Sequence, residues 1–180
     1  MRKLLAILVF IVVVLVGCSS QTLYDAISKS EFGKYDKPEI LYQNDDVGVV
    51  IFLSKDSNGD FYIYRTTYEL TKFNRYELDK TEMFTVAVDI GRKSEFVHLD
   101  TIGENTDEPI NFVWGGIFHY PKAEHVTYKI TDGDGTLHEN QVEINNKHIF
   151  VDLLPEEFED TYSITFDVID RDGNVLFSYN

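Results

Sequence analysis

The segments VGVVIFL (Val47–Leu53), DSNGD (Asp56–Asp60) and FYIYRTT (Phe61–Thr67) follow one another and decide the fold class of this chain. A continuous apolar run such as the first is typical of a strand that is buried on both faces. An Asn-Gly pair between two such runs is the strongest short signal for a β-hairpin. The three segments therefore predict two antiparallel strands joined by a turn at Asn58-Gly59.

Alternating apolar and polar residues recur through the rest of the chain, separated by turn signals such as Asp132–Gly135 and Asp172-Gly173. Further candidate strands are residues 84–90, 96–102, 126–131, 141–144, 148–153, 162–168 and 175–177. Short strands at this spacing are typical of a sandwich or a barrel. We expect a mainly β (α+β) protein with an antiparallel β-rich body and an immunoglobulin-like β-sandwich in its C-terminal half.

One short helix is predicted ahead of the strands. Thr22 can cap it, and Asp25 stands three residues later, in the position of a capping box. Leu23 and Ile27 share one face of the helix, and Gly33 ends the segment.

The clearest candidate boundary between domains is Gly103–Pro109, which is polar, acidic and ends in proline. It divides the chain into a signal segment (1–17), a short helix plus antiparallel sheet (18–103) and a small β-sandwich-like domain (104–180).

The N-terminus has the three parts of a secretory signal. A basic start, Met1-Arg2-Lys3, precedes an unbroken apolar run from Leu4 to Val16 and then Gly17-Cys18-Ser19-Ser20. A transmembrane helix is the alternative, but it needs roughly 20 apolar residues. No basic stop-transfer cluster follows the run. We therefore expect a signal helix that is removed.

Leu15-Val16-Gly17-Cys18 resembles the lipobox of bacterial lipoproteins, in which the signal is cut just before the cysteine. The resemblance implies that the Cys18 thiol carries a diacylglyceryl lipid and that the new N-terminus is then acylated, typically with palmitate. Cys18 is the only cysteine, so an internal disulfide is excluded, and lipidation gives the single thiol a use. We expect no other cofactor.

With Trp114–Ile117 (Trp-Gly-Gly-Ile) entering a hairpin-rich C-terminus, the chain is similar to uncharacterised small lipoproteins of Gram-positive bacteria. This resemblance implies a location and no activity. The expected place is the outer face of a cytoplasmic membrane, reached through the lipid anchor, with a Gram-negative envelope as the alternative.

The charge is strongly acidic, −15 for the whole chain and −17 once Arg2 and Lys3 are removed. This charge argues against binding nucleic acid or anionic lipid headgroups through a large basic face. The acidic surface either keeps the protein soluble or attracts cations or a basic partner.

Paired carboxylates occur in the turns, where calcium would find oxygen ligands. The pairs are Asp56 and Asp60, Asp132 and Asp134, and Asp170 and Asp172. The EF-hand pattern fails, because Gln141 or Tyr179 stands where the bidentate glutamate belongs. Hairpin turns need the same Asp-Gly and Asn-Gly pairs. We therefore predict no metal, with calcium at Asp132, Asp134, Asp170 and Asp172 as the alternative.

Recognisable catalytic motifs are absent from the sequence, including Gly-x-Ser-x-Gly, the P-loop, His-Glu-x-x-His and Cys-x-x-Cys. The histidines lack the spacing of a zinc site; they are His98, His119, His125, His138 and His148. Glu156, Glu157, Glu159 and Asp160 could include a glycosidase-like pair, or simply form an acidic loop. We expect a non-enzymatic protein, with a cell-wall or glycan hydrolase as the alternative.

Three tyrosines at strand spacing, Tyr62, Tyr64 and Tyr68, form a stripe opposite Phe61 and Ile63. An exposed stripe would make a stacking platform for a glycan or an envelope protein. Core packing is the alternative use of such a stripe. We expect a membrane-anchored module that binds or supports something in the cell envelope and does not bind nucleic acid.

Overall fold

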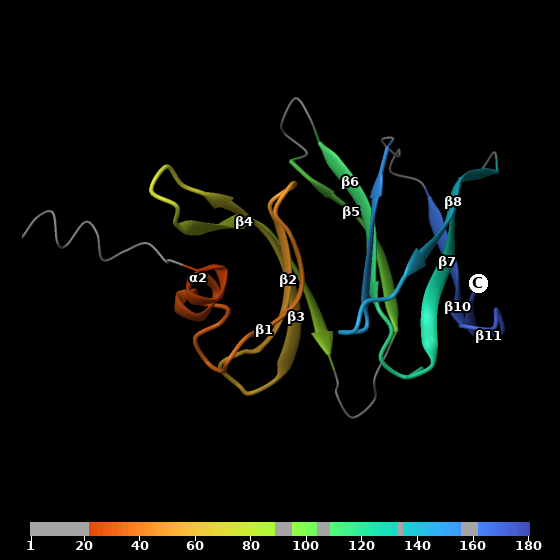
Figure 1. Ribbon diagram of the computed structural model, residues 1–180, viewed down its shortest axis with the longest axis horizontal. Coiled ribbons are helices and arrows are strands. Elements are labelled where there is room, and N and C mark those ends of the chain that lie inside the picture. The colour runs from red at the N-terminus through yellow and green to blue at the C-terminus, as the bar shows by residue number, and fades with distance from the viewer. Residues whose placement is uncertain (1–21, 89–94, 104–108, 133–134, 156–161) are drawn as a thin grey trace, which may run out of the picture. The chain divides into compact units, whose positions relative to one another are not determined.

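The computed structural model describes residues 22–88, 95–103, 109–132, 135–155 and 162–180 (Figure 1). It is mostly β, with antiparallel sheets in a sandwich-like arrangement and one short helix, which confirms the predicted fold class. The predicted signal helix lies outside the described residues. The chain divides into two compact units between Val86 and Ala87.

The first unit is a sheet with the order β1-β2-β3-β4, with α2 packed on it (Figure 1). Its elements are α2 (Leu23–Lys29), β1 (Glu39–Asn44), β2 (Val49–Lys55), β3 (Phe61–Leu70) and β4 (Tyr76–Val88). β2 pairs antiparallel with β1 and with β3, and Phe52 lies opposite Tyr64. The hairpin predicted around Asn58-Gly59 is therefore confirmed.

The helix begins as its sequence predicts. The side-chain hydroxyl of Thr22 accepts a hydrogen bond from the backbone N–H of Asp25, at 3.0 Å. Leu23 and Ile27 are buried and pack with Val50 and Phe52 of the sheet. α2 thus covers one face of the sheet with the apolar side that its spacing predicts.

The other face of the same sheet is also buried. Ile51 is fully buried and Ile63 is 1% exposed. Arg65, 4% exposed, donates from its guanidinium to the backbone carbonyl of Glu82 and lies 5.9 Å from the centre of the Phe84 ring. A charged group at such a site is stabilised only when it is bonded. The apolar run from Val47 to Leu53 therefore forms the doubly buried strand that it predicts.

The second unit is a sandwich of two antiparallel sheets. Its strands are β5 (Phe96–Ile102), β6 (Ile110–Gly116), β7 (Ala123–Thr131), β8 (Thr136–Glu143), β9 (Ile149–Leu154), β10 (Ser163–Asp170) and β11 (Val175–Tyr179). One sheet has the order β5-β6-β9 and the other β11-β10-β7-β8. β10 therefore lies between β7 and β11, and β9 pairs with β6. This is the immunoglobulin-like arrangement expected for the C-terminal half.

The core of the sandwich comes from both sheets. Val113 and Phe150 of the first sheet pack with Val126, Tyr128 and Phe166 of the second. The Tyr128 hydroxyl donates to the Asp152 carboxylate on β9, at 2.6 Å. Burial, and then this bond, raises the pKa of Tyr128, so the hydroxyl stays protonated and links the two sheets.

The Trp-Gly-Gly segment has a packing role on β6. Trp114 is fully buried. A side chain at Gly115 would lie 2.2 Å from the Phe96 carbonyl oxygen and 2.6 Å from the Phe150 ring. A side chain at Gly116 would meet the Phe118 ring at 2.4 Å. The glycines leave the space that these rings fill.

The units divide at Val86 and Ala87, not at residues 103 and 104 as we expected from the acidic segment. β5 pairs along its length with β6, from Phe96 opposite Gly116 to Ile102 opposite Ile110. Gly103, with φ +71°, directly follows β5. The polar, proline-ended segment therefore connects two paired strands of one sheet. Composition alone does not distinguish such a connection from a linker, because both are solvated.

Candidate functional site

The described residues contain a surface cavity of about 420 Å³ in the first unit, built from the ends of β3 and β4. It is lined by Thr67, Tyr68, Glu69, Glu77, Leu78 and Asp79. Three of these six side chains are carboxylates, and none is a cation. We did not predict this site from the sequence. The sequence does contain one signal for it: Glu77 and Asp79 are two positions apart, which places both carboxylates on one face of a strand.

Tyr68 forms the inner wall of the cavity. Its ring packs against Tyr76 with 5.7 Å between centroids. Its hydroxyl donates a hydrogen bond to the Asp45 carboxylate. Burial, and then this bond, raises the pKa of Tyr68, and the same bond lowers the pKa of Asp45. Tyr68 therefore adds no charge to the cavity and keeps its wall rigid.

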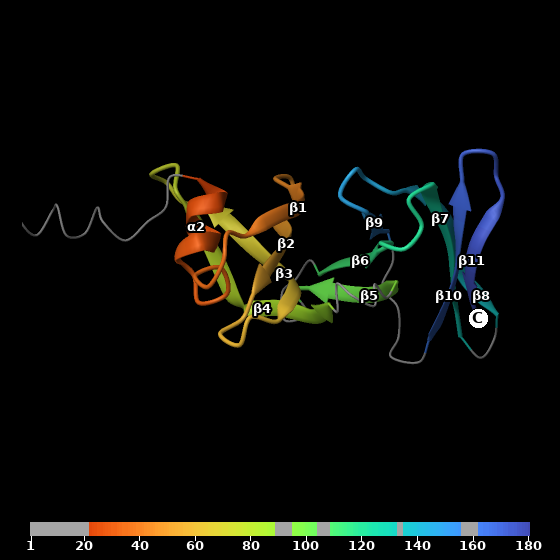
Figure 2. The same ribbon diagram turned by 90° about the horizontal axis from the view of Figure 1, so that it is seen from below.

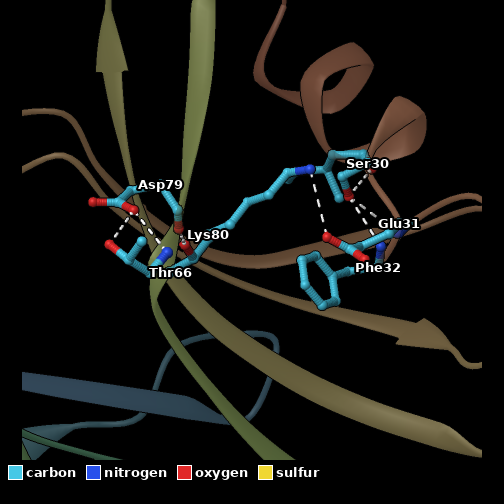
Figure 3. Close-up of polar contacts among 9 residues, drawn as sticks. Ser30, Glu31, Phe32, Thr66, Asp79 and Lys80 are labelled. Carbon is cyan, nitrogen blue, oxygen red and sulfur yellow. Dashed lines mark hydrogen bonds and ion pairs between the residues drawn. The ribbon is translucent and has the colours of Figure 1, made fainter.

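Asp79 is held in its ionised form by its neighbour Thr81. The Thr81 hydroxyl and backbone N–H donate to one carboxylate oxygen at 2.7 and 2.8 Å, and these bonds lower the pKa of Asp79. The Thr66 hydroxyl donates to the Asp79 carbonyl (Figure 3). The Thr66 bond joins β3 to β4 beside the cavity, and the Thr81 bonds keep one of the cavity's negative charges in place.

Lys80 is directed away from Asp79 toward the segment after α2 (Figure 3). Its ammonium group lies 3.5 Å from the Glu31 carboxylate, and both side chains are exposed. In that segment the Ser30 hydroxyl accepts from the N–H groups of Phe32 and Gly33, each at 3.2 Å. An exposed ion pair of this kind contributes little to stability. The pair does direct Lys80 to Glu31 and away from the carboxylate of Asp79.

The cavity suits an organic cation better than a metal ion. Among the described residues no group of three or more His, Cys, Asp or Glu side chains is close enough together to hold a metal. Glu69, Glu77 and Asp79 are exposed residues of the cavity lining, and Leu78 offers an apolar contact. An amine or a guanidinium with a short apolar stem could meet both kinds of surface.

The tyrosine stripe faces the core, so the exposed stacking platform that we considered is wrong. Tyr64 is 6% and Tyr68 8% exposed, and Tyr62 is partly buried. Tyr64 lies 5.1 Å from the Phe52 ring and 5.5 Å from the Phe32 ring. The strand period places the three rings on one face, but only the packing of α2 and Phe32 on that face buries them.

Four turns share one backbone conformation; we call them the five-residue turns. They span residues 56–60, 71–75, 145–149 and 170–174. In each, the first N–H donates to the fifth carbonyl and the fourth N–H to the first carbonyl, at 2.9 to 3.2 Å. The fourth residue always has a positive φ: it is Gly59, Asn74, His148 or Gly173.

The acids that we considered for calcium build these turns. The Oδ1 atom of Asp170 accepts from the N–H groups of Asp172 and Asn174, at 2.9 and 2.8 Å. Asp56 and Asn145 make the equivalent pair of bonds in their own turns. The neutral amide of Asn145 does this as well as a carboxylate. The turn conformation therefore accounts for these residues without a bound ion.

Elsewhere in the described chain, Asp132 accepts from the Gly135 N–H at 3.0 Å. Asp134 lies outside the described residues.

The Trp114 indole N–H donates to Asp100 at 3.3 Å, and burial lowers the pKa of the adjacent His98. His119 pairs with Glu95 at 3.2 Å. These contacts give the residues structural partners within the second unit.

Cys18 and the cluster Glu156, Glu157, Glu159 and Asp160 lie outside the described residues, so lipidation and the hydrolase alternative stay predictions. In the part of the chain that the structure describes, no helix is both long and apolar enough to cross a membrane. No family model, curated protein or solved structure matches the chain.

Proposed function

We propose that this chain is a lipid-anchored, extracytoplasmic binding protein without catalytic activity. The observation that carries the proposal is the lipobox-like Leu15-Val16-Gly17-Cys18, which stands only four residues before the Thr22 cap of α2. Two or more acyl chains hold a protein on a bilayer stably. Four residues reach at most about 14 Å. The first unit is then held close to the membrane.

The cavity between β3 and β4 supports binding as the role of that unit. Glu69, Glu77 and Asp79 give it a negative charge, and the bonds of Thr81 keep Asp79 ionised. We propose that its ligand carries an amine or a guanidinium, either as a small molecule or as the basic side chain of an envelope protein. The overall charge of −15 favours the approach of such a ligand over distance.

Anchoring is tested by Cys18→Ala in cells that are fed an alkyne-tagged fatty acid, with Ser19→Ala as the matched control. We expect Ser19→Ala to keep both the label and the membrane fraction. We expect Cys18→Ala to lose the label and to accumulate with its signal uncut. Mass spectrometry of the N-terminal peptide checks the site. Label that persists in Cys18→Ala would exclude the anchor.

Ligand binding is tested by calorimetry of the purified full chain with trilysine as the probe. The double variant Glu69→Gln/Glu77→Gln should weaken binding about tenfold or more, because each carboxylate contributes on the order of 1 kcal/mol at close range in water. The control Glu143→Gln/Asp172→Asn removes the same charge from the second unit and should leave binding within about twofold. Equal losses in both variants would leave only unspecific attraction and reject the site.

A further inference from the structure

The turn between β3 and β4, residues Thr71–Arg75, carries an exposed aromatic ring that its conformation does not need. Phe73 is 84% exposed, and Leu70 beside the turn is 55% exposed. The third residue of the other five-residue turns is Asn58, Lys147 or Asp172. The same backbone is therefore built with a polar residue at this position in each of those turns. Exposing a phenylalanine in water is unfavourable, so the ring is a candidate contact with something apolar.

The charge of this turn also differs from that of the protein. Thr71–Arg75 contains Lys72 and Arg75 and no acid, a formal charge of +2. The turns 56–60, 145–149 and 170–174 carry −2, +1 and −1. Lys72 is exposed and Arg75 half-buried. A basic, aromatic tip on a strongly acidic chain is complementary to an anionic surface with an apolar interior.

The position of the turn fits a membrane surface. In both ribbon views the yellow turn between β3 and β4 lies on the side of the first unit where α2 begins (Figures 1 and 2). If Cys18 is lipidated, Thr22 lies within about 14 Å of the bilayer surface. The tip is then on the side of the unit that faces the lipid.

We propose that Phe73, with Leu70 and Lys72, inserts into the headgroup region of an anionic bilayer and forms a second membrane contact beside the lipid anchor. This inference rests on the proposed anchoring at Cys18. Phe73 would enter the interface, where aromatic side chains are favoured, and Lys72 would meet lipid phosphates. Glu69 and Glu77 lie behind the tip, in the cavity wall, and limit the insertion to the turn itself. The contact holds the cavity at a fixed height above the membrane.

The test uses the lipidated full chain in vesicles, with a nitroxide spin label at residue 73, where the apolar ring of the label takes the place of the phenylalanine ring. Because Cys18 is the only cysteine and its sulfur carries the lipid, Phe73→Cys has one free thiol. Asp172→Cys, at the equivalent position of the turn 170–174, is the matched control. Accessibility of the label to oxygen and to a water-soluble nickel complex reports its depth. The vesicles contain phosphatidylcholine, with or without phosphatidylglycerol.

We expect the label at residue 73 to become oxygen-accessible and nickel-protected in the phosphatidylglycerol vesicles, while the label at residue 172 stays in water. Adding Lys72→Ser should lower the equilibrium constant for insertion about fivefold, the factor that one basic residue contributes at an anionic surface. Raising the salt from 0.1 to 1 M should weaken insertion in the same direction, because it shortens the screening length from about 10 to about 3 Å.

Three outcomes would overturn the proposal on an anchored chain: a label at residue 73 that stays in water, equal protection at residues 73 and 172, or protection that appears only after envelope proteins are added. The last result would assign the tip to a protein partner. A separate measurement tests the anchor. If mass spectrometry finds Cys18 without lipid, both the proposed function and this contact fail, which differs from a water-exposed label on a lipidated chain.

Discussion

The turn Thr71–Arg75 of the first unit and the turn Asp170–Asn174 of the second have the same backbone hydrogen bonds and different chemistry. The second turn follows the local rules closely, with an aspartate that bonds its own backbone and a glycine at the positive φ of +83°. The first has a threonine and Asn74 at these positions and exposes Phe73. A residue that the turn conformation requires is explained by the fold itself. The turn conformation does not require Phe73, so Phe73 points to a role outside the fold.

The largest effect on stability is expected at Gly115, which lies in β6 and not in a turn. Gly115→Ala would place a methyl group 2.2 Å from the Phe96 carbonyl oxygen, so β5 or the Phe150 ring must move. We expect a loss of about 3 kcal/mol in the free energy of unfolding, typical of overpacking. Denaturant unfolding followed by Trp114 fluorescence measures it. A loss below about 0.5 kcal/mol would show that β6 has room the structure does not indicate.

Replacing a turn glycine should lower the free energy of unfolding less, because the space around it is open. Nothing lies within 4 Å of a side chain at Gly173, so Gly173→Ala pays only for the positive φ. We expect about 1 kcal/mol from the same unfolding measurement. Gly173→Asn should cost roughly half as much, because asparagine accepts this conformation, as Asn74 does in the equivalent turn. Equal costs for Ala and Asn would break the equivalence of the two turns.

The two turns should also differ in their response to acid. Hydrogen bonds, first from the Asn174 side chain, lower the pKa of Asp170, whereas the turn Thr71–Arg75 has no carboxylate. A lowered folded-state pKa stabilises the fold above the ordinary carboxyl pKa of about 4 and loses that effect as pH falls through the lowered value.

Asp170→Asn keeps the backbone bonds, as Asn145 shows in its own turn. The stability difference between wild type and Asp170→Asn should therefore be constant above about pH 5 and shrink below about pH 4. Thermal unfolding across this range measures it. A stability difference that does not change with pH would mean that the charge of the Asp170 carboxylate does not stabilise the fold.

The smallest effect on stability is expected at Phe73. Because its ring is 84% exposed, Phe73→Ser should change the free energy of unfolding by less than about 0.5 kcal/mol. The same variant should lose the membrane contact proposed above. A loss of 2 kcal/mol or more would place the ring in the fold and remove the distinction between the two turns.

Much of this molecule follows from short patterns in its chain. The Thr22 cap, the doubly buried strand at Val49–Leu53 and the turn at Asn58-Gly59 depend on neighbours within a few residues, and each was predictable. The cavity was not predicted, because the pattern of each strand does not show that Glu69, Glu77 and Asp79 leave a hollow beside the β3–β4 turn. The buried tyrosine stripe shows the same limit. A period of two assigns residues to faces and leaves open what covers each face.

Local sequence was sufficient to predict the strand-rich fold class and the turn residues, because each depends on side chains a few positions apart. The secretory and lipobox-like N-terminus is a pattern of the same local kind and stays a prediction. Tertiary structure alone decided three things: that β5 completes the sandwich, that α2 buries the tyrosines, and that three carboxylates share one cavity. None of these follows from the spacing of residues along a single strand or helix. Their geometry is set by the packing of whole sheets, which no local pattern encodes.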